Sequence, residues 1–314
     1  MQRRKLGRSG LEIAPIVFGG NVFGWTADEP TSFALLDAFV AGGFNCIDTA
    51  DVYSRWVPGH PGGESETVIG NWLKRRGKRD DVIVATKVGG DMGEGRNLKK
   101  DYILKCADAS LKRLQTDYID LYQEHWDDDV TPVEETMEAF ATLIRAGKVR
   151  AIGASNLTPA RLRESLAASA KHGWPRYESL QPHYNLVERP EYERDFEALC
   201  VEQGLGVIPY WSLAAGFLTG KYRSEADLSK SPRGGGVKKY LDARGMRVLA
   251  ALDRVAREVG GTPAQVALAW LIARPSITAP IASATSLAQW HDIAVAAKMT
   301  LSPEAIGVLN AASG

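Results

Sequence analysis

The sequence predicts an α/β protein folded as a single (β/α)8 TIM barrel with an N-terminal β-hairpin and extra C-terminal helices. Eight short runs rich in β-branched and aromatic residues alternate with segments of helical period, the pattern of repeated βα units around a parallel sheet. Eight such units fill 314 residues better than a doubly wound sheet with a second domain does. No linker and no internal repeat divides the chain, so we expect residues 1–314 to form one domain.

The predicted strands are too short for helices and are rich in residues that favour a pleated, buried surface. They span residues 16–20, 44–49, 82–88, 119–125, 149–155, 177–184, 206–211 and 278–283.

The intervening helices have recognisable ends. Thr158 and Ser302 each precede a proline, as an N-cap precedes an N1 proline, and the segments 131–134 and 262–265 are typical of capping boxes. Glycines follow the helical runs at positions 42, 43, 77, 147, 173, 204 and 260, where a left-handed residue is favoured.

Three segments depart from the alternation of strands and helices. Residues 4–13 predict a small hairpin before the first barrel strand, and residues 260–274 predict a helix beyond the alternation. Residues 213–244 form a long connection rich in Gly, Lys and Ser, a length at which loops of compact domains are usually functional lids or disordered. The sequence leaves both interpretations open for this connection.

Composition excludes several classes of function. The 38 Lys and Arg residues balance 38 Asp and Glu residues, so no net charge attracts nucleic acid or an anionic membrane surface. Three scattered cysteines predict neither a disulfide framework nor a CxxC zinc site. The basic start lacks the apolar stretch of a signal peptide and no run approaches a membrane span, so we expect a cytoplasmic protein. The acidic run 127–129 precedes a predicted helix start, where acidic residues favour the helix dipole, so we expect no metal site.

Four polar residues at strand ends are the candidates for catalysis, because barrel active sites form where strands end and βα loops begin. They are Asp48 at the end of the second strand and Tyr53 just after it, Lys87 at the end of the third and His125 at the end of the fourth. Each alone has an ordinary structural interpretation, but together they would point into one pocket. A Lys⁺ beside a Tyr favours the phenolate and lowers its pKa, which makes Tyr53 a proton donor usable near neutral pH. A neutral His125 would orient a carbonyl oxygen.

Three tryptophans lie in the predicted βα loops, where aromatic side chains usually line an apolar substrate pocket. These candidates for the substrate pocket are Trp25, Trp56 and Trp126.

Six segments together resemble the aldo-keto reductase family. They are residues 44–53 (FNCIDTADVY), 62–70, 86–87, 120–126 (DLYQEHW), 147–156 (GKVRAIGASN) and 216–222 (GFLTGKY). The resemblance runs from Leu6 to the end of the chain and is greatest to the bacterial members with a long seventh βα loop.

The resemblance implies a catalytic tetrad of Asp48, Tyr53, Lys87 and His125, with Tyr53 as the general acid/base for hydride transfer with a nicotinamide cofactor. The protein would reduce aldehydes or ketones, or oxidise the matching alcohols or sugars. The usual Tyr-Ser-Pro-Leu-Ala pattern of the nucleotide loop reads Tyr-Trp-Ser-Leu-Ala here, so Trp211 takes the usual serine position. The implied cofactor-binding residues are Ser155, Asn156, Gln181, Tyr210, Trp211, Ser212, Leu213, Gly216, Lys221, Ser283, Thr285 and Asp292.

The family default is NADP(H), but residues 282–292, where members that select NADPH usually place a cation on the 2′-phosphate, contain no Lys or Arg. NAD(H) is therefore a second candidate cofactor, and Arg233, Lys238 or Lys239 of the lid are alternative sources of the missing cation.

Two other functions remain open from the sequence. Lys87 could form an imine in a Schiff-base lyase. The same fold also serves a non-catalytic, nucleotide-sensing channel subunit. The sequence identifies neither the substrate nor the oligomeric state.

Overall fold

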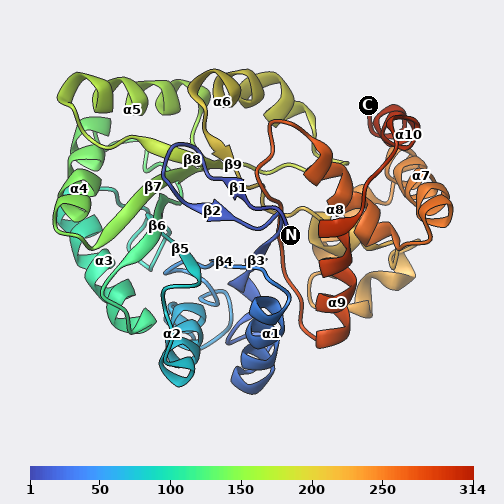
Figure 1. Ribbon diagram of the computed structural model, residues 1–314, viewed down its shortest axis with the longest axis horizontal. Helices are drawn as coiled ribbons and strands as arrows, with labels where there is room; N and C mark the ends of the chain where they lie inside the picture. Colours follow the sequence, from blue (N-terminus) through green and yellow to red (C-terminus); the bar gives the residue numbers. More distant parts are fainter.

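The computed structural model describes residues 1–314 and contains eight parallel strands curled into a barrel, with helices outside it (Figure 1). Neighbouring strands follow the order β10-β3-β4-β5-β6-β7-β8-β9. The strands are β3 (Val17–Gly19), β4 (Cys46–Asp48), β5 (Ile83–Val88), β6 (Ile119–Glu124), β7 (Val149–Ser155), β8 (Tyr177–Gln181), β9 (Gly206–Val207) and β10 (Ile281–Ala282).

Backbone hydrogen bonds close the barrel between its last and its seventh strand. The Thr278 amide donates to the Val207 carbonyl at 2.8 Å, and the Ile281 amide donates to the Pro209 carbonyl at 2.9 Å. The predicted barrel is therefore confirmed, although several strands are shorter than their apolar runs. The runs predicted at 177–184 and 206–211 end as strands at Gln181 and Val207, and beyond them only an isolated bridge between His183 and Tyr210 continues the pairing.

Eight helices complete the βα units. They are α1 (Glu29–Ala41), α2 (Glu64–Arg76), α3 (Lys100–Leu114), α4 (Val133–Arg145), α5 (Pro159–His172), α6 (Glu197–Gln203), α8 (Pro263–Ala273) and α9 (Leu287–Val295). None of the helices combines the length and the apolar composition that a membrane span requires.

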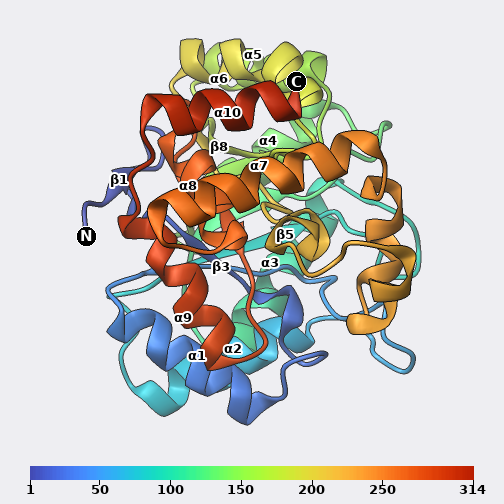
Figure 2. The same ribbon diagram turned by 90° about the vertical axis from the view of Figure 1, so that its right-hand side faces the viewer.

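The supernumerary helices are α7 (Ala243–Val259) and α10 (Pro303–Ser313), which pack on each other at the periphery (Figures 1 and 2). The expectation that residues 260–274 lie beyond the alternation is wrong, because α8 leads directly into β10 and packs beside α9. The helices α7 and α8 both bury apolar residues, but α8 is buried on nearly all sides and α7 on one face only.

The N-terminal hairpin, β1 (Arg4–Lys5) paired antiparallel with β2 (Glu12–Ile13), seals the bottom of the barrel. Leu6 and Ile13 belong to the small apolar cluster inside the barrel, together with Val17, Leu121 and Ile208. The hairpin is also hydrogen-bonded to residues that precede two barrel strands. The Arg4 guanidinium donates to the Thr278 carbonyl, and the Asn45 side-chain amide donates to the Glu12 carbonyl. Only the opposite end of the barrel is left to form a site.

Alternation along the strands separates two cores. Leu121 faces the barrel interior, whereas Tyr122 belongs to a second, much larger cluster between the sheet and the helices. Because side chains alternate between the two faces of a strand, Gln123 points inward and Glu124 outward. The outward set includes buried polar groups that the apolar pattern does not predict.

Most of the predicted helix caps are confirmed. Thr158 and Ser302 cap α5 and α10, and Thr262 with Gln265 forms a capping box at α8. The predicted box at residues 131–134 is wrong, because α4 begins with Pro132 as N-cap and no side-chain cap. The Asp128 carboxylate accepts both the Thr131 amide and its hydroxyl, at 2.8 and 2.6 Å, and so engages the side chain that would have capped the helix.

The long connection between β9 and α7 is ordered and lies at the end of the barrel away from the hairpin (Figure 2). It contains three short turns of 3-10 helix, Ala214–Thr219, Glu225–Lys230 and Gly234–Tyr240. We refer to residues 213–244 as the lid.

A buried carboxyl on the outer face of β6 makes stability depend on pH. Glu124 is hydrogen-bonded by the Tyr177 hydroxyl, and burial raises the pKa of Glu124 to about 8. The protonated carboxyl is thus favoured in the folded state, so its contribution is complete below about pH 4.5 and is lost as pH rises to about 8.

We therefore expect Glu124→Gln, which keeps an acceptor for Tyr177, to reduce the loss of unfolding free energy between pH 5 and pH 8. The substitution should remove a pH dependence of the unfolding free energy of at most about 1.4 kcal/mol per pH unit. Urea unfolding of both proteins at pH 5, 7 and 9 measures the effect, and parallel stability curves would contradict it.

Candidate active site

A buried ion pair lies at the carboxyl ends of β4 and β5. The Lys87 ammonium donates to Asp48 Oδ2 at 2.7 Å, to the Thr49 carbonyl at 2.8 Å and to the Tyr53 hydroxyl at 2.9 Å. Both charged side chains are inaccessible to solvent. The opposite oxygen of Asp48 accepts the Gln181 amide at 2.9 Å, so the carboxylate is fixed from two sides.

Tyr53 lies beside this pair, with its hydroxyl 3.4 Å from Asp48 Oδ2. Burial and the Asp48 carboxylate raise the pKa of Tyr53 well above its usual range. The sequence-based expectation of a lowered pKa is therefore not met, because Asp48 offsets the charge of Lys87 and burial favours the neutral phenol. The phenol is protonated at neutral pH, which is the form that a general acid requires.

His125 completes the group from the end of β6. Its ring is 5.9 Å from that of Tyr53, and Trp126 stacks on it with ring centroids 3.6 Å apart. Burial lowers the pKa of His125 well below its usual range, with Lys87 and Arg96 adding to the effect. The imidazole is neutral and is suited to donate a hydrogen bond to an uncharged oxygen.

The backbone after Tyr53 is strained. Ser54 has φ of +72°, a backbone conformation that residues other than glycine rarely adopt. Its hydroxyl donates to the Phe23 carbonyl at 2.9 Å. Strain of this kind concentrates at sites where a precise side-chain position matters. The sequence offered no signal for it, because glycine is the residue expected at such a position.

The three tryptophans predicted to form a substrate pocket come together around this group. Trp25 and Trp56 pack edge to face at 5.5 Å, Trp56 lies 5.9 Å from the Tyr53 ring, and Trp126 covers His125. Trp56 is 49% exposed, so an aromatic wall faces solvent next to the phenol.

Arg233 of the lid reaches the same region. Its guanidinium lies 5.4 Å from the Trp25 ring, and its charge acts to lower the pKa of Tyr53. Its Nη2 atom is buried without a hydrogen-bonding partner. By contrast, Lys238 and Lys239 of the lid pair with Glu225 and Glu188. Of the three lid cations considered from the sequence, Arg233 alone is left to meet an anion.

The residues expected at the nicotinamide also lie together. The Tyr210 hydroxyl donates to Asn156 Oδ1 at 2.9 Å, and the Asn156 amide donates to Ser155 Oγ and to the His125 carbonyl. Ser155 in turn donates to the Gln181 carbonyl, and Gln181 reaches Asp48. This network joins the Tyr210 ring to the group around Lys87.

The segment expected to contact the cofactor's phosphates has an unusual backbone. Trp211, Ala214, Ala215 and Gly216 all have positive φ, and Trp211 is 48% exposed. Lys221 lies along Gly216, where a β-carbon would be 3.3 Å from its Cε. Leu213 directly precedes the left-handed run 214–216, and the Ser212 hydroxyl donates to the Pro209 carbonyl.

The last three cofactor candidates are engaged within the protein. The Ser283 hydroxyl donates to Asn21, and Thr285 donates to Gln289. Asp292 accepts from both members of the capping box at the start of α8, Thr262 at 3.1 Å and Gln265 at 2.7 Å. The sequence did not reveal this role of Asp292, which organises a helix start.

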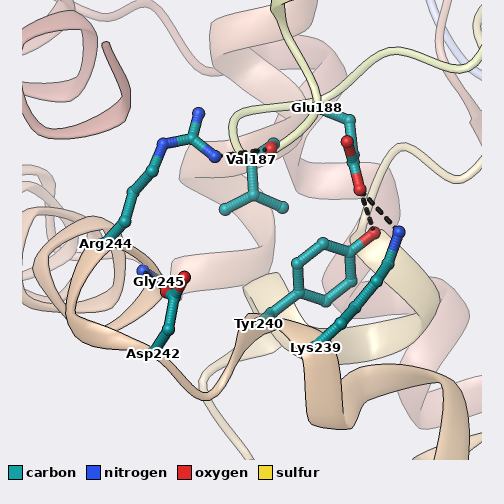
Figure 3. A pocket seen from close by; sticks show the side chains of 7 residues that line it. All are labelled: Val187, Glu188, Lys239, Tyr240, Asp242, Arg244 and Gly245. Carbon is teal, nitrogen blue, oxygen red and sulfur yellow. Dashed lines mark hydrogen bonds and ion pairs between the residues drawn. The ribbon is translucent and has the colours of Figure 1, made fainter.

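The far end of the lid is anchored beside a small pocket of about 140 Å³ (Figure 3). Figure 3 shows the Glu188 carboxylate accepting the Lys239 ammonium at 2.7 Å and the Tyr240 hydroxyl at 2.9 Å. Arg244 donates to the backbone carbonyls of Val187 and Ser313. The lid is therefore bound to the barrel at residues 187–188.

The fold and this cluster define a barrel protein whose polar side chains meet at the carboxyl ends of the strands, the location of barrel active sites. The chain belongs to the aldo/keto reductase family, whose sequence profile matches residues 15–313. Membership implies an oxidoreductase that works with a nicotinamide cofactor.

Relatives of similar length match nearly the whole chain. The chain is 35% identical to the uncharacterized oxidoreductase YrpG of Bacillus subtilis, over 99% of this chain and 95% of the relative. It is 34% identical to the protein Tas of Escherichia coli, over 92% and 91%. A probable voltage-gated potassium channel subunit beta of Arabidopsis thaliana is 32% identical, over 92% and 89%.

Proposed function

We propose that this protein reduces aldehydes or ketones, and oxidises the matching alcohols, with Tyr53 as general acid and base. The observation that carries the proposal is the triple hydrogen bonding of Lys87 to Asp48, Thr49 and Tyr53 next to a neutral His125. A nicotinamide cofactor supplies the hydride in this chemistry.

The roles of the side chains follow from their protonation. The His125 imidazole orients the carbonyl oxygen, and Tyr53, protonated at neutral pH, gives that oxygen its proton as negative charge develops there. The Lys87 ammonium stabilises the phenolate that remains, and Asp48 fixes the ammonium. In alcohol oxidation the proton returns to the same phenolate.

The donors present fit a nicotinamide cofactor. Ser155, Asn156 and Gln181 offer hydroxyl and amide groups beside the Tyr210 ring, which suits a flat carboxamide-bearing heterocycle. Lys221 and Arg233 offer cations along the lid, which suits phosphate groups. The three tryptophans suit an apolar or aromatic carbonyl substrate.

The geometry gives no support to a Schiff-base lyase. All three N–H groups of Lys87 are hydrogen-bonded and the side chain is inaccessible, whereas an imine needs a free, deprotonated amine.

Turnover tests the proposed function. A panel of aldehydes, ketones and sugars assayed with NADPH and NADH, in both directions, should give cofactor-dependent absorbance changes for at least one substrate class. A chain that binds the cofactor and turns over none of them would instead be a nucleotide-binding sensor.

We expect weak discrimination between NADPH and NADH, because residues 282–292 contain no Lys or Arg. Losing one charge-assisted hydrogen bond, worth about 1.5–3 kcal/mol, lowers a phosphate preference by roughly ten- to a hundredfold. The kcat/KM ratio for the two cofactors measures the discrimination. A preference for NADPH above about a thousandfold would contradict this expectation.

Whatever preference for NADPH remains should depend on Arg233, the lid cation without an acidic partner. Arg233→Met is expected to reduce it, whereas the control Lys238→Met, which removes a cation paired with Glu225, should leave it unchanged. A preference unaffected by both variants would place the phosphate elsewhere.

A further inference from the structure

A second carboxyl, not used in the proposed chemistry, belongs to a residue that is hydrogen-bonded to the backbone of the catalytic lysine. Asp51 follows β4 three residues after Asp48, and its backbone amide donates to the carbonyl of Lys87 itself at 3.3 Å. The residue is 2% exposed. Its position is therefore fixed relative to the backbone that carries the lysine.

Neither oxygen of Asp51 has a hydrogen-bonding partner, although both are buried. The hydroxyl of Tyr122, on the neighbouring outward face of β6, is likewise buried and unpartnered, and Asp51 is the charge that acts on it most strongly. Unpaired buried polar groups are rare in folded proteins, and each calls for an explanation.

The charges around Asp51 do not neutralise it. Glu66 accepts Arg113 Nε at 2.6 Å and the Thr86 hydroxyl at 2.5 Å, and Asp48 accepts Lys87. Each of these acids has its own basic partner, so Asp51 is the unmatched carboxyl of the group. The titratable and charged groups that face it are Glu66 on α2, Tyr102, Cys106 and Arg113 on α3, Lys87 on β5 and Tyr122 on β6.

The loop before α2 packs over Asp51, since a β-carbon on Gly62 would lie 3.1 Å from the Asp51 carbonyl oxygen. Gly63, with φ of +86°, packs so closely on Arg113 that a β-carbon there would lie 2.5 Å from its Cδ. Solvent therefore does not compensate a charge on Asp51. Burial and the Glu66 carboxylate raise the pKa of Asp51 to about 8, within the range in which alcohol oxidation is measured.

We propose that Asp51 is a positioning residue for the catalytic lysine, acting on the Lys87 ammonium from behind and setting the pH at which Tyr53 accepts the proton of an alcohol. An ionised Asp51 adds negative charge beside Lys87 and so holds protons on the Lys87–Tyr53 pair. A protonated Asp51 leaves that pair easier to deprotonate. The inference rests on the proposed function and assigns a regulator to the same site.

The test is the pH profile of kcat/KM for alcohol oxidation, from pH 6 to pH 10, in wild type, Asp51→Asn and Glu124→Gln. Asp51→Asn should move the rising, acidic limb, which reports the deprotonation of Tyr53, downward by about half a pH unit or more, since the loss of a neighbouring buried negative charge lowers a pKa by that order. Glu124→Gln removes an equally buried carboxyl of the same pKa that faces Tyr177 instead, so its profile should match wild type. If the Asp51→Asn protein does not fold, the Asp51→Ser protein is measured in its place.

An unchanged profile in the Asp51 variant overturns the inference, and so does an equal shift in both variants, which would reveal only a general field effect. A wild-type chain that turns over no carbonyl contradicts the proposed function itself. A wild type that turns over carbonyls while its Asp51 variant keeps the same profile contradicts the role of Asp51 alone.

Discussion

Tyr53→Phe should lower kcat for carbonyl reduction by about 10² to 10⁴, because the ring stays and the dissociable proton is lost. The phenol is the only group that lies 2.9 Å from the Lys87 ammonium and next to the neutral His125. Steady-state kinetics with a substrate that the wild type accepts measures the loss. Cofactor binding, followed by quenching of tryptophan fluorescence, should persist, since the hydrogen bond from Tyr210 to Asn156 does not involve Tyr53.

A Tyr53→Phe variant with wild-type turnover would refute the assignment of the acid. Loss of cofactor binding together with activity would instead indicate a collapsed site. Phe at this position should still fold, at a cost of about 1–3 kcal/mol, because the ring stays in place while the Lys87 N–H that donates to the hydroxyl at 2.9 Å loses its acceptor.

Lys87→Met should abolish measurable reduction and also destabilise the fold. Removing one partner of a buried ion pair leaves Asp48 without its counter-ion, at a cost of about 3–5 kcal/mol. Residual alcohol oxidation should have its pH optimum displaced upward, because the charge that favours the phenolate is gone. Urea unfolding and a pH series of the oxidation rate measure the two effects.

The double variant Asp48→Asn/Lys87→Met separates stability from catalysis. An asparagine can still accept the Gln181 amide, and no buried charge remains, so most of the lost stability should return while activity stays absent. Equal stability of the single and double variants would mean that Asp48 is not the source of the cost.

The barrel and the residues around Lys87 are predictable because their signals are local. Short apolar runs that end near Asp48, Lys87 and His125 are enough to place those side chains at one end of a parallel sheet. The fold brings them within contact of Tyr53. The balance of charge and burial that decides which groups are protonated is not local, because it depends on the whole surroundings of each side chain.

The expectations that differed from the structure depended on contacts between distant segments. Thr131 has a good local capping signal, but the Asp128 carboxylate competes for it. Glu124 meets Tyr177 across 53 positions of sequence, and Arg233 meets Trp25 across the mouth of the barrel. The choice between α7 and α8 as the supernumerary helix depended on which one packs against α9, and a pattern of apolar residues does not contain that information.

The hairpin that closes the bottom of the barrel also sets the face at which residues 1–3 emerge. Met1 is 48% exposed and lies at the face opposite the lid (Figure 2), with Leu6 and Ile13 anchoring the segment behind it. A protein tethered to a support through its N-terminus would therefore have the lid end of the barrel directed away from the support. Immobilisation through the N-terminal side would leave the end of the barrel that carries Lys87 and the lid open to solution.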